Sequence, residues 1–488
     1  MARICVVGAG AGGLAVAARL GAKRHEVIVL EASNRVGGKL HTVRRDGFAF
    51  DAGPSLFTLP AVYRDLFLKT GPPLEHEVDL IETEPGFAYR FGDGTELALP
   101  GSSVGRTCAA ISEQFGSDAG DSWRTLMGRA ADIWRLTRGD VLGTAIDGPR
   151  QLMSLAKPRD LRTVAPWLSL QAMATKTLSD PRLVTILMRY ATYSGSRPDS
   201  APGALITIPF VEQTFGLWHI GGGLGVLADA MHRRCEKAGV EFRLETPVAA
   251  ITNMAGAVTG VTTDTGEHIA ADIVVSDIDS RHLMGLLAPG AAADSGGTLD
   301  SYSGFAILAA VSGTSTGLHH HNVWFPTDYS AEFTDLAAGR PIRDPAIYVC
   351  RPEDPTMAPA GAEAWFILVN APRHDPTAPD GHDWSDDAAN ESYADGILDL
   401  LAARGTDIRD RVRWRILQTP RDLGVRDRSG DGAIYGKASH GAMSVLRRAR
   451  NVGPLDGLYQ VGGTAHPGGG LPLVGMSAEI VADLIGRA

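Results

Sequence analysis

The first forty residues alternate short apolar runs with glycines, and this pattern predicts a strand, a turn, a helix and a second strand. Ile4–Val7 is a short apolar run, typical of a strand buried on both faces. Glycines interrupt it, and apolar residues at helical spacing follow from about Ala11 to Leu20. The run "EVIVLE" then ends at Glu31. We therefore expect a βαβ unit that opens a parallel sheet.

The centre and the end of the chain have different periods. Between Gly116 and Thr177, apolar residues recur at helical spacing, which predicts a helical region. Strands are predicted at 248–254, 257–266, 269–279, 346–359 and 364–372. Near the end, a strand over 458–461 is broken by glycines, and a helix with Pro472 in its first turn runs to about Ile485. The apolar stretch "FAILAAVSG" is too short to span a bilayer.

Composition narrows the function. The chain of 488 residues has a net charge of -10, which argues against general nucleic-acid binding. The four cysteines are scattered and form no CxxC pair, which indicates a reduced, cytosolic setting without disulfides or structural zinc. Only Arg3 supplies an early positive charge, and glycines interrupt the apolar N-terminus, so it does not fit a signal peptide.

The first glycine turn has the chemistry of a dinucleotide site. Gly8, Gly10 and Gly13 form GxGxxG directly after a strand. In such a turn the backbone approaches a pyrophosphate, and the following helix points its positive end at it. Glu31 ends the next strand, where an acid accepts hydrogen bonds from a ribose and repels a 2'-phosphate.

Two further segments select the dinucleotide. "EASNRVGGKLHT" resembles the E-A-x-x-R-x-G-G-[KR]-x-x-[ST] stretch of flavoproteins of the amine oxidase and phytoene desaturase superfamily. "FAFDAGPSLFTLP" resembles the D-x-G-P segment of the same superfamily, which runs near the isoalloxazine ring. The resemblance implies FAD. Arg35 and Lys39 meet phosphate charge or form a solvated basic loop, and Asp51 is either a catalytic base or the anchor of a turn.

The C-terminal stretch "VGGTAHPGGGLPLVGMSA" resembles the signature of bacterial phytoene desaturase-type carotenoid oxidoreductases. The likeness extends, in the same order, through "WHIGGGLGVLADAM", "HHNVWFPTDYSAEFTDL" and "AIYGKASHGAMSVLRRARN". It implies that a second helix N-terminus lies beside the flavin and stabilises the negative charge of its reduced form. The wording "AIYGKASHG" and "GGGLPLV" is closer to relatives that act on later or hydroxylated carotenoids.

The resulting fold class is α/β, with a discontinuous Rossmann-like FAD-binding domain, an inserted α+β substrate domain and a helical cap. We assign 1–100, 218–285 and 440–488 to the FAD domain, and 101–217 and 286–439 to the substrate-binding, cap and membrane-facing domain. The predicted cofactor-binding residues come from the two ends of the chain and from one central strand: Gly8, Gly10, Gly12, Gly13, Glu31, Ala32, Arg35, Gly37, Gly38, Lys39, Gly53, Pro54, Ser55, Val248, Gly463, Thr464, Leu473 and Val474.

Other polar residues are candidates without an assigned role. Asp51, His219, Asp277 and His466 are candidates for catalysis, and His466 either tethers the flavin or forms a His-Pro turn. The glycines of 221–225 predict a close-packed turn back to the cofactor domain. The run "HHH" suggests a metal, but consecutive strand residues alternate faces, so we predict no metal site.

The family resemblance implies FAD-dependent desaturation of a long apolar polyene such as phytoene, neurosporene or lycopene, by hydride transfer to flavin. A hydroxycarotenoid 3,4-desaturase or a carotenoid terminal oxidase is the first alternative, and a flavin-dependent polyene isomerase the second. An amine oxidase fits less well because it needs an aromatic cage near the flavin. Oxygen or a membrane quinone is the expected electron acceptor.

The helical region carries more basic than acidic residues, which indicates either a membrane-surface patch or a helical cap with a solvated basic face. We therefore expect a cytoplasmic protein that associates peripherally with the cytoplasmic membrane. The basic residues of this region are Arg124, Arg129, Arg135, Arg138, Arg150, Lys157, Arg159 and Arg162.

Overall fold

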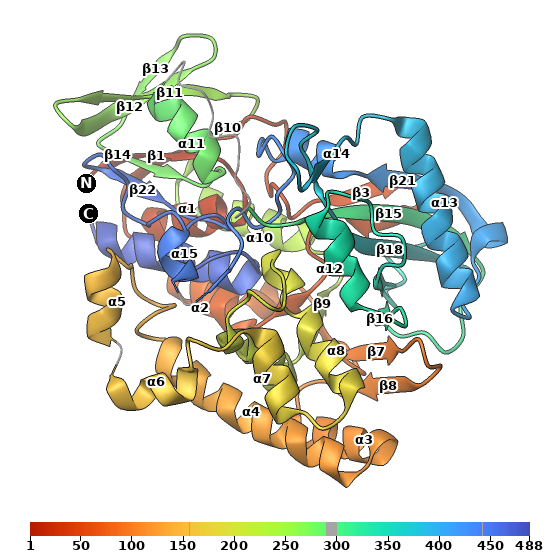
Figure 1. Ribbon diagram of the computed structural model, residues 1–488. Helices are drawn as coiled ribbons and strands as arrows, with labels where there is room; N and C mark the ends of the chain where they lie inside the picture. The colour runs from red at the N-terminus through yellow and green to blue at the C-terminus, as the bar shows by residue number, and fades with distance from the viewer. Residues whose placement is uncertain (156, 289–299, 442) are drawn as a thin grey trace.

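The computed structural model describes residues 1–155, 157–288, 300–441 and 443–488 (Figure 1). Two large sheets lie side by side in the view, one at the left with both chain termini and one at the right. The last residue is tied to the end of the first helix, because the backbone N–H of Ala488 donates to the carbonyl of Lys23 at 3.2 Å.

The first sheet is parallel and contains the predicted βαβ unit. Its central strands are buried apolar runs, as expected for strands covered on both faces. Ends of the chain far apart in sequence meet here, since β22 near the C-terminus pairs with β14. The strand order is β10 (Glu241–Arg243), β2 (Glu26–Leu30), β1 (Arg3–Val7), β14 (Ile273–Ser276) and β22 (Leu458–Gln460).

Helices cover this sheet and form one apolar core with it. The predicted helix at 11–20 is confirmed and extends to Ala22. Helix α1 packs against the C-terminal helix α15, so the two helices that flank the predicted cofactor site support each other. The covering helices are α1 (Ala11–Ala22), α2 (Ala61–Thr70), α10 (Gly225–Lys237) and α15 (Leu471–Ile485).

The second sheet is mixed and has seven strands. Its central strand β15 carries the stretch "FAILAAVS", whose alternate residues separate two cores. Phe305 and Ile307 face the core that contains α13 (Asp387–Ala403), whereas Ala306 and Leu308 face the core that contains the helical region. The order is β21 (Val412–Gln418), β15 (Ser303–Ser312), β18 (Ala362–Ala371), β17 (Ile347–Cys350), β16 (His321–Trp324), β7 (Phe87–Arg90) and β8 (Glu96–Leu99).

Strands β7 and β8 lie inside the segment 1–100 that we assigned to the FAD domain, yet they pair with the second sheet through β16. The transition between the sheets therefore falls before Phe87. A separate three-stranded sheet follows β10, and its strands β11 (Val248–Met254) and β12 (Ala257–Thr263) lie where strands were predicted. The single strand predicted at 269–279 is instead divided between β13 (His268–Ala270) in this sheet and β14 in the first sheet.

The predicted helical region runs below the second sheet in Figure 1. Trp123, Leu126, Met127 and Ala130 of α4 are buried, so the periodicity of the sequence marks its core face. None of the described helices combines the length and apolar character needed to cross a membrane. The helices are α3 (Val104–Phe115), α4 (Ser117–Thr137), α5 (Pro149–Leu155), α6 (Pro158–Val164), α7 (Leu170–Thr177), α8 (Pro181–Arg189) and α9 (Thr207–Phe215).

Candidate functional site

The first glycine turn is packed so tightly that side chains are excluded. A Cβ on Gly13 would lie 2.1 Å from the carbonyl oxygen of Gly8, well inside van der Waals contact. Gly8 has φ +99°, a backbone conformation that favours glycine. The turn delivers α1 with Gly10 as its N-cap and no capping side chain within α1 itself. The N–H groups at this helix start are therefore directed at whatever lies in front of them.

A carboxylate lies in front of that helix start. Asp277 follows β14, next to β1, and its carboxyl lies against the start of α1, where the N–H groups of Gly10 and Gly13 act to lower its pKa. Its oxygens lie where a Cβ on Gly10, Gly12 or Gly462 would fall, at 2.6, 2.4 and 2.3 Å. We call Gly10, Gly12, Gly13 and Gly462 the glycine mouth. An anionic group already sits in it, so the mouth has the donors that a phosphate needs.

Burial raises the pKa of Asp277 to about 7, although the N–H groups of Gly13 and Gly10 act to lower it. Glu31 raises the pKa further, and Lys39 lowers it. Near pH 7 this carboxyl is therefore divided between a neutral donor form and an anion. The neutral form is compatible with a neighbouring phosphate.

The carboxylate of Glu31, which directly follows β2, accepts hydrogen bonds beside the glycine mouth. One oxygen accepts from the N–H of Ala9 at 2.7 Å, and the other accepts from the N–H and the hydroxyl of Ser33 at 2.9 Å each. The carbonyl of Glu31 accepts from Thr246, which brings Val248 at the start of β11 to the same end of the sheet. Ala32 lies between these anchors. The predicted cofactor-binding residues Glu31, Ala32 and Val248 thus lie at the same end of the first sheet.

The second predicted loop crosses the first. The N–H of Gly37 donates to the carbonyl of Ala9 at 2.8 Å, and a Cβ on Gly38 would lie 3.1 Å from the Cα of Gly10. Lys39 does not point at the glycine mouth: its Nζ donates to the carbonyl of Ile434 at 3.0 Å and pairs with Asp427 at 3.5 Å.

Gly53 continues this packing, since a Cβ there would lie 2.1 Å from the carbonyl of Lys39. Arg35 stays local as well, with Nη1 3.5 Å from the carbonyl of Gly38. Burial, and then the charge of Arg426, hold the pKa of Arg35 below its ordinary value. The two segments that carry the flavoprotein resemblance, 31–42 and 51–55, therefore lie directly against each other.

The C-terminal turn closes the mouth. Gly462, Gly468 and Gly470 have φ of +98°, +140° and +102°, and α15 begins after Gly470. Gly463 lies against Gly469, and the hydroxyl of Thr464 accepts from the N–H of Ser280 at 3.1 Å. The start of α15 includes Leu473 and Val474, both partly exposed.

Asp51 and His219 hold the turn at 221–225. Asp51 accepts from the N–H of Leu224 at 2.8 Å and from the hydroxyl of Thr42 at 3.0 Å. Burial raises its pKa to about 6, against the effect of these donors. His219 Nε2 lies 2.9 Å from Asp354, which also accepts from Gly222 at 2.8 Å. Carboxylates thus take up N–H groups of this second glycine run.

His466 is buried, and its Nε2 lies 2.8 Å from the carbonyl of Val141. Its backbone carbonyl accepts from Asn451 at 2.8 Å. Burial lowers the pKa of His466, so it is neutral near pH 7. The side chain therefore ties the C-terminal turn to the segment after α4.

A cluster of polar side chains that the sequence did not single out lies between the second sheet and α8. The guanidinium of Arg189 donates to the hydroxyl of Tyr193 at 2.8 Å and lies over the rings of Phe87, Tyr193 and Tyr348. Tyr348 in turn lies 2.8 Å from the hydroxyl of Ser55. We call Arg189, Tyr89, Tyr193, Tyr329 and Tyr348 the arginine nest. It adjoins the segment that the flavoprotein resemblance places near the isoalloxazine ring.

The histidine run borders the nest. His321 begins β16, and its Nδ1 lies 2.9 Å from the hydroxyl of Tyr348. His320 precedes the strand, so the alternation of strand residues does not separate it from His321. Donor atoms of His320, His321 and Cys350 lie within 4.8 Å of one another. Burial lowers the pKa of both histidines and raises that of the thiol, so all three are neutral near pH 7.

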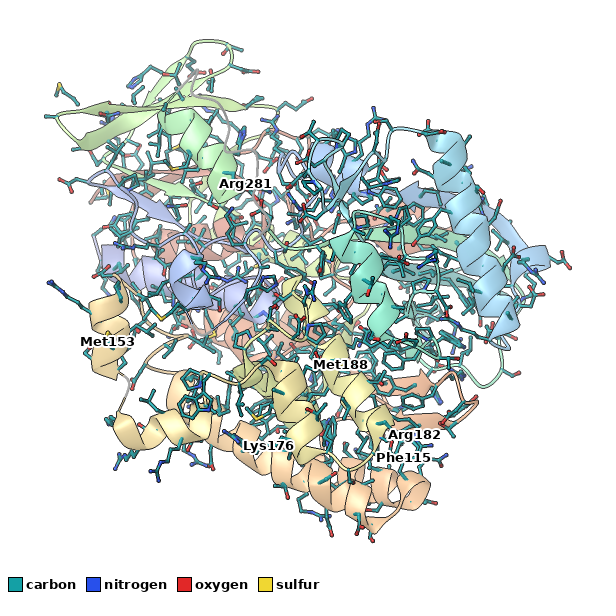
Figure 2. All side chains as sticks on the ribbon, in the orientation of Figure 1. Phe115, Met153, Lys176, Arg182, Met188 and Arg281 are labelled. Atoms are coloured by element: carbon teal, nitrogen blue, oxygen red, sulfur yellow. The ribbon has the colours of Figure 1, made fainter. Side chains whose placement is uncertain are left out.

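A cavity of about 430 Å³ lies between the end of α8 and α12 (Ser330–Ala337). Met188 lines it from α8 and Phe333 from α12, together with the Arg197–Asp199 ion pair. None of the predicted cofactor residues lines this cavity. It is therefore not the cofactor site. Figure 2 places Met188 near the centre of the view, on α8.

Comparison with known proteins identifies the family. Residues 11–300 match the family of flavin containing amine oxidoreductases. A 4,4'-diapolycopene oxygenase from a Methylomonas species is 30% identical over 99% of this chain and 98% of its own. A 1-hydroxycarotenoid 3,4-desaturase from a Flavobacterium species is 29% identical over 99% of both chains. A hydroxyneurosporene desaturase from Rubrivivax gelatinosus is 32% identical over 99% and 93%.

Solved structures agree on the fold. An oxidoreductase from Methanosarcina mazei superposes with a TM-score of 0.66 at 17% identity, over 99% of this chain and 100% of that one. A putrescine oxidase variant superposes with a TM-score of 0.65 at 16% identity, over 100% and 99%.

The chain belongs to the flavin containing amine oxidoreductase family, and it is an FAD-dependent oxidoreductase. Its residues fit the cofactor. The glycine mouth has no room for side chains and already holds the carboxyl of Asp277, and Glu31 directly follows the second strand of the βαβ unit. The predictions of the family, of an enzyme and of FAD are thus confirmed, and the α/β fold class is confirmed at the level of the shared fold.

Proposed function

We propose that the protein dehydrogenates a carotenoid. The observation that carries this proposal is similarity along the full length of the chain to three enzymes named for carotenoid substrates. When bound, FAD supplies a hydride acceptor. The protein's part is to bury the polyene and exclude water, which apolar surface does without polar contacts.

The second sheet suits the burial of such a substrate. Rings from β7 and from the loops that follow β7 and β16 stack in a row, with Phe87 next to Tyr89, Tyr89 next to Phe325, and Phe325 next to Phe91, at centroid distances of 5.6 to 6.0 Å. We propose the second sheet with α3–α9 as the substrate domain and cap. The first sheet, with the segments flanking it, is the FAD domain in this proposal.

We also propose peripheral contact with a membrane, through α5, α6 and the loop after α6. Met153 is 72% exposed and Trp167 66% exposed, and Leu161 is partly exposed between them. Basic residues surround them on the same segment. Apolar and basic side chains together favour the interface of an anionic bilayer. The exposed basic residues are Arg150, Lys157, Arg159 and Arg162. Quinone dissolved in that membrane, or oxygen, is the proposed acceptor of the electrons.

The test is an anaerobic flavin spectrum of the purified protein, recorded before and after addition of liposomes that contain a carotenoid. Dehydrogenation bleaches the oxidised flavin band and yields a product with a longer conjugated system that is lighter by two hydrogens. A product that is heavier by one oxygen, formed only in air, assigns the protein to oxygenation instead. A polyene that changes geometry at constant mass, with the flavin still oxidised, assigns it to isomerisation.

A further inference from the structure

Arg189 is a buried cation in the part of the molecule where an apolar substrate is proposed to lie. It ends α8 and is 7% exposed. Its guanidinium carbon lies 5.2, 5.1 and 5.4 Å from the ring centroids of Phe87, Tyr193 and Tyr348. Aromatic faces attract a cation, but they do not accept its N–H groups in the plane of the guanidinium.

The hydrogen bonds of this guanidinium are incomplete. It has five N–H donors, and within the described ranges the bond to Tyr193 is the only hydrogen bond of good geometry that it makes to the protein. No carboxylate of the described residues lies within 4.0 Å of it. Glu212, one of two buried acids whose pKa the charge of Arg189 acts to lower, is instead bound by the hydroxyl of Tyr190 at 2.6 Å, and burial raises the pKa of Glu212 to about 7.

Two neighbouring tyrosine hydroxyls also lack hydrogen-bond partners in the part of the chain that the structure describes. Those of Tyr89 and Tyr329 are buried and have no partner among the described residues. Burying polar donors without acceptors costs free energy, and burying a charge without a partner costs more. If the arginine nest contacted only a hydrocarbon, the protein would be more stable with Leu or Met than with Arg at position 189. The nest therefore lacks an acceptor.

The place of the nest indicates where such an acceptor belongs. Tyr348 connects it to Ser55, at 2.8 Å, on the segment expected beside the flavin. The similar 1-hydroxycarotenoid 3,4-desaturase is named for a substrate with oxygen on carbon 1 and a reaction between carbons 3 and 4. In such a substrate the oxygen lies two carbons from the reacting bond. A polar side chain of the protein near the flavin would then contact the oxygen-bearing end of the substrate.

We propose that Arg189 binds an oxygen atom close to the reacting end of the polyene, so that the substrate is an oxygenated carotenoid rather than a hydrocarbon. The oxygen belongs to a hydroxyl or a carbonyl group, both of which accept from a guanidinium. This inference rests on the proposed function and assigns its substrate class. Arg189 is then a specificity-determining residue, with Tyr89 and Tyr193 beside it.

The test measures binding without turnover. The holoprotein is kept anaerobic with its flavin chemically reduced, so that it cannot accept a hydride. Tryptophan quenching then gives the affinity for lycopene, for 1-hydroxylycopene and for an end-aldehyde analogue. We expect the oxygenated compound that matches the site to bind about tenfold more tightly than lycopene, or better, as for a hydrogen bond to a charged group.

Arg189→Met should abolish this preference and leave the affinity for lycopene within about twofold of the original, because a methionine keeps apolar contact. Arg189→Lys should keep part of it. The matched control is Arg182→Met on the same helix. Arg182 pairs with Asp180 at 2.6 Å and lies 3.8 Å from the ring centre of Phe115, so its loss should leave the preference unchanged (Figure 2).

Equal affinity of the original protein for lycopene and both oxygenated compounds would overturn the proposal. So would an equal loss of affinity for all three compounds in Arg189→Met, particularly with a lower melting temperature, because that pattern indicates a structural role. If Arg189→Met does not fold, an unchanged preference in Arg189→Lys and in Arg189→Gln overturns it. Failure of the proposed function itself is separate: with oxidised flavin, no carotenoid would bleach the band, whatever the affinity ratio.

Discussion

The glycine mouth and the arginine nest both bury polar groups next to the expected flavin, but they are built in opposite ways. In the mouth, the carboxyl of Asp277 lies directly in front of the backbone N–H groups at the start of α1, so an acceptor faces the donors. In the nest, side chains from β7, β17, α8 and two loops gather donors that lack acceptors. The mouth is complete in its backbone and serves a cofactor common to the family. Within the described residues the nest lacks acceptors for its donors, and for that reason we propose it as the place where substrates are distinguished.

Disrupting the mouth should have the largest effect. In Gly13→Ala the new Cβ would lie 2.1 Å from the carbonyl of Gly8, where neither backbone can move without displacing the start of α1. We expect the free energy of unfolding to fall by about 3 kcal/mol, and FAD to be lost on gel filtration. Calorimetry and the flavin absorbance of the eluted protein measure both effects.

Gly128→Ala is the control for that substitution. Gly128 lies inside α4, and a Cβ added there would meet no heavy atom within 4 Å outside its own stretch of helix. Alanine there should raise stability by about 0.5 to 1 kcal/mol and leave FAD bound. A Gly13→Ala protein that keeps its flavin and its melting temperature would refute the close packing that defines the mouth.

The carboxyl of Asp277 in the glycine mouth should have a smaller effect, a dependence of FAD affinity on pH. A bound diphosphate disfavours ionised Asp277, so FAD binding takes up a proton once the pH exceeds the pKa of about 7. We expect the dissociation constant of FAD to be nearly constant below pH 6 and to rise about tenfold between pH 6 and pH 8. In Asp277→Asn this dependence should disappear. Quenching of flavin fluorescence by the apoprotein measures the affinity.

The stability of the apoprotein should also fall as the pH rises. The carboxyl of Asp277 binds its proton more tightly in the folded protein than in the unfolded chain, so stability falls as the pH rises from about 4 through about 7. Asp51→Asn is the matched control, since burial raises the pKa of Asp51 too, but its partner is the turn at Leu224. An original protein whose FAD affinity does not change with pH would contradict the role given to Asp277.

The glycine mouth and the arginine nest also differ in how much of each can be predicted from the sequence. The mouth is encoded within a few residues: a strand, GxGxxG and an acid at the end of the next strand, so its glycines and Glu31 could be found by spacing. Asp277 could be noticed only as a polar residue at a strand end. Its position in front of Gly10 needs the β1–β14 pairing, which joins residues far apart in the chain.

The nest has no local signal. Tyr89, Arg189 and Tyr348 come from three separate segments, and each looks like an ordinary member of an amphipathic helix or strand. Only the pairing of β7, β16 and β17 brings them together. The same pairing takes 87–99 out of the segment assigned to the FAD domain. The histidine run was judged by strand alternation, but β16 begins at His321, so the rule did not apply to His320.

The smallest effect concerns the outer surface, which neither the mouth nor the nest reaches. Met153 on α5 and Met254 on β11 are both 72% exposed, but only Met153 lies among the basic residues of the α5–α6 region (Figure 2). If this region contacts a membrane, Met153→Ser should weaken binding to anionic vesicles about threefold, while Met254→Ser should not change it. Trp167→Ser should weaken it more, about fivefold. Co-sedimentation at low and high salt measures the binding, which should fall with salt because lysine and arginine contribute to it. Equal effects of the two methionine substitutions would contradict the proposed contact of the α5–α6 region with a membrane.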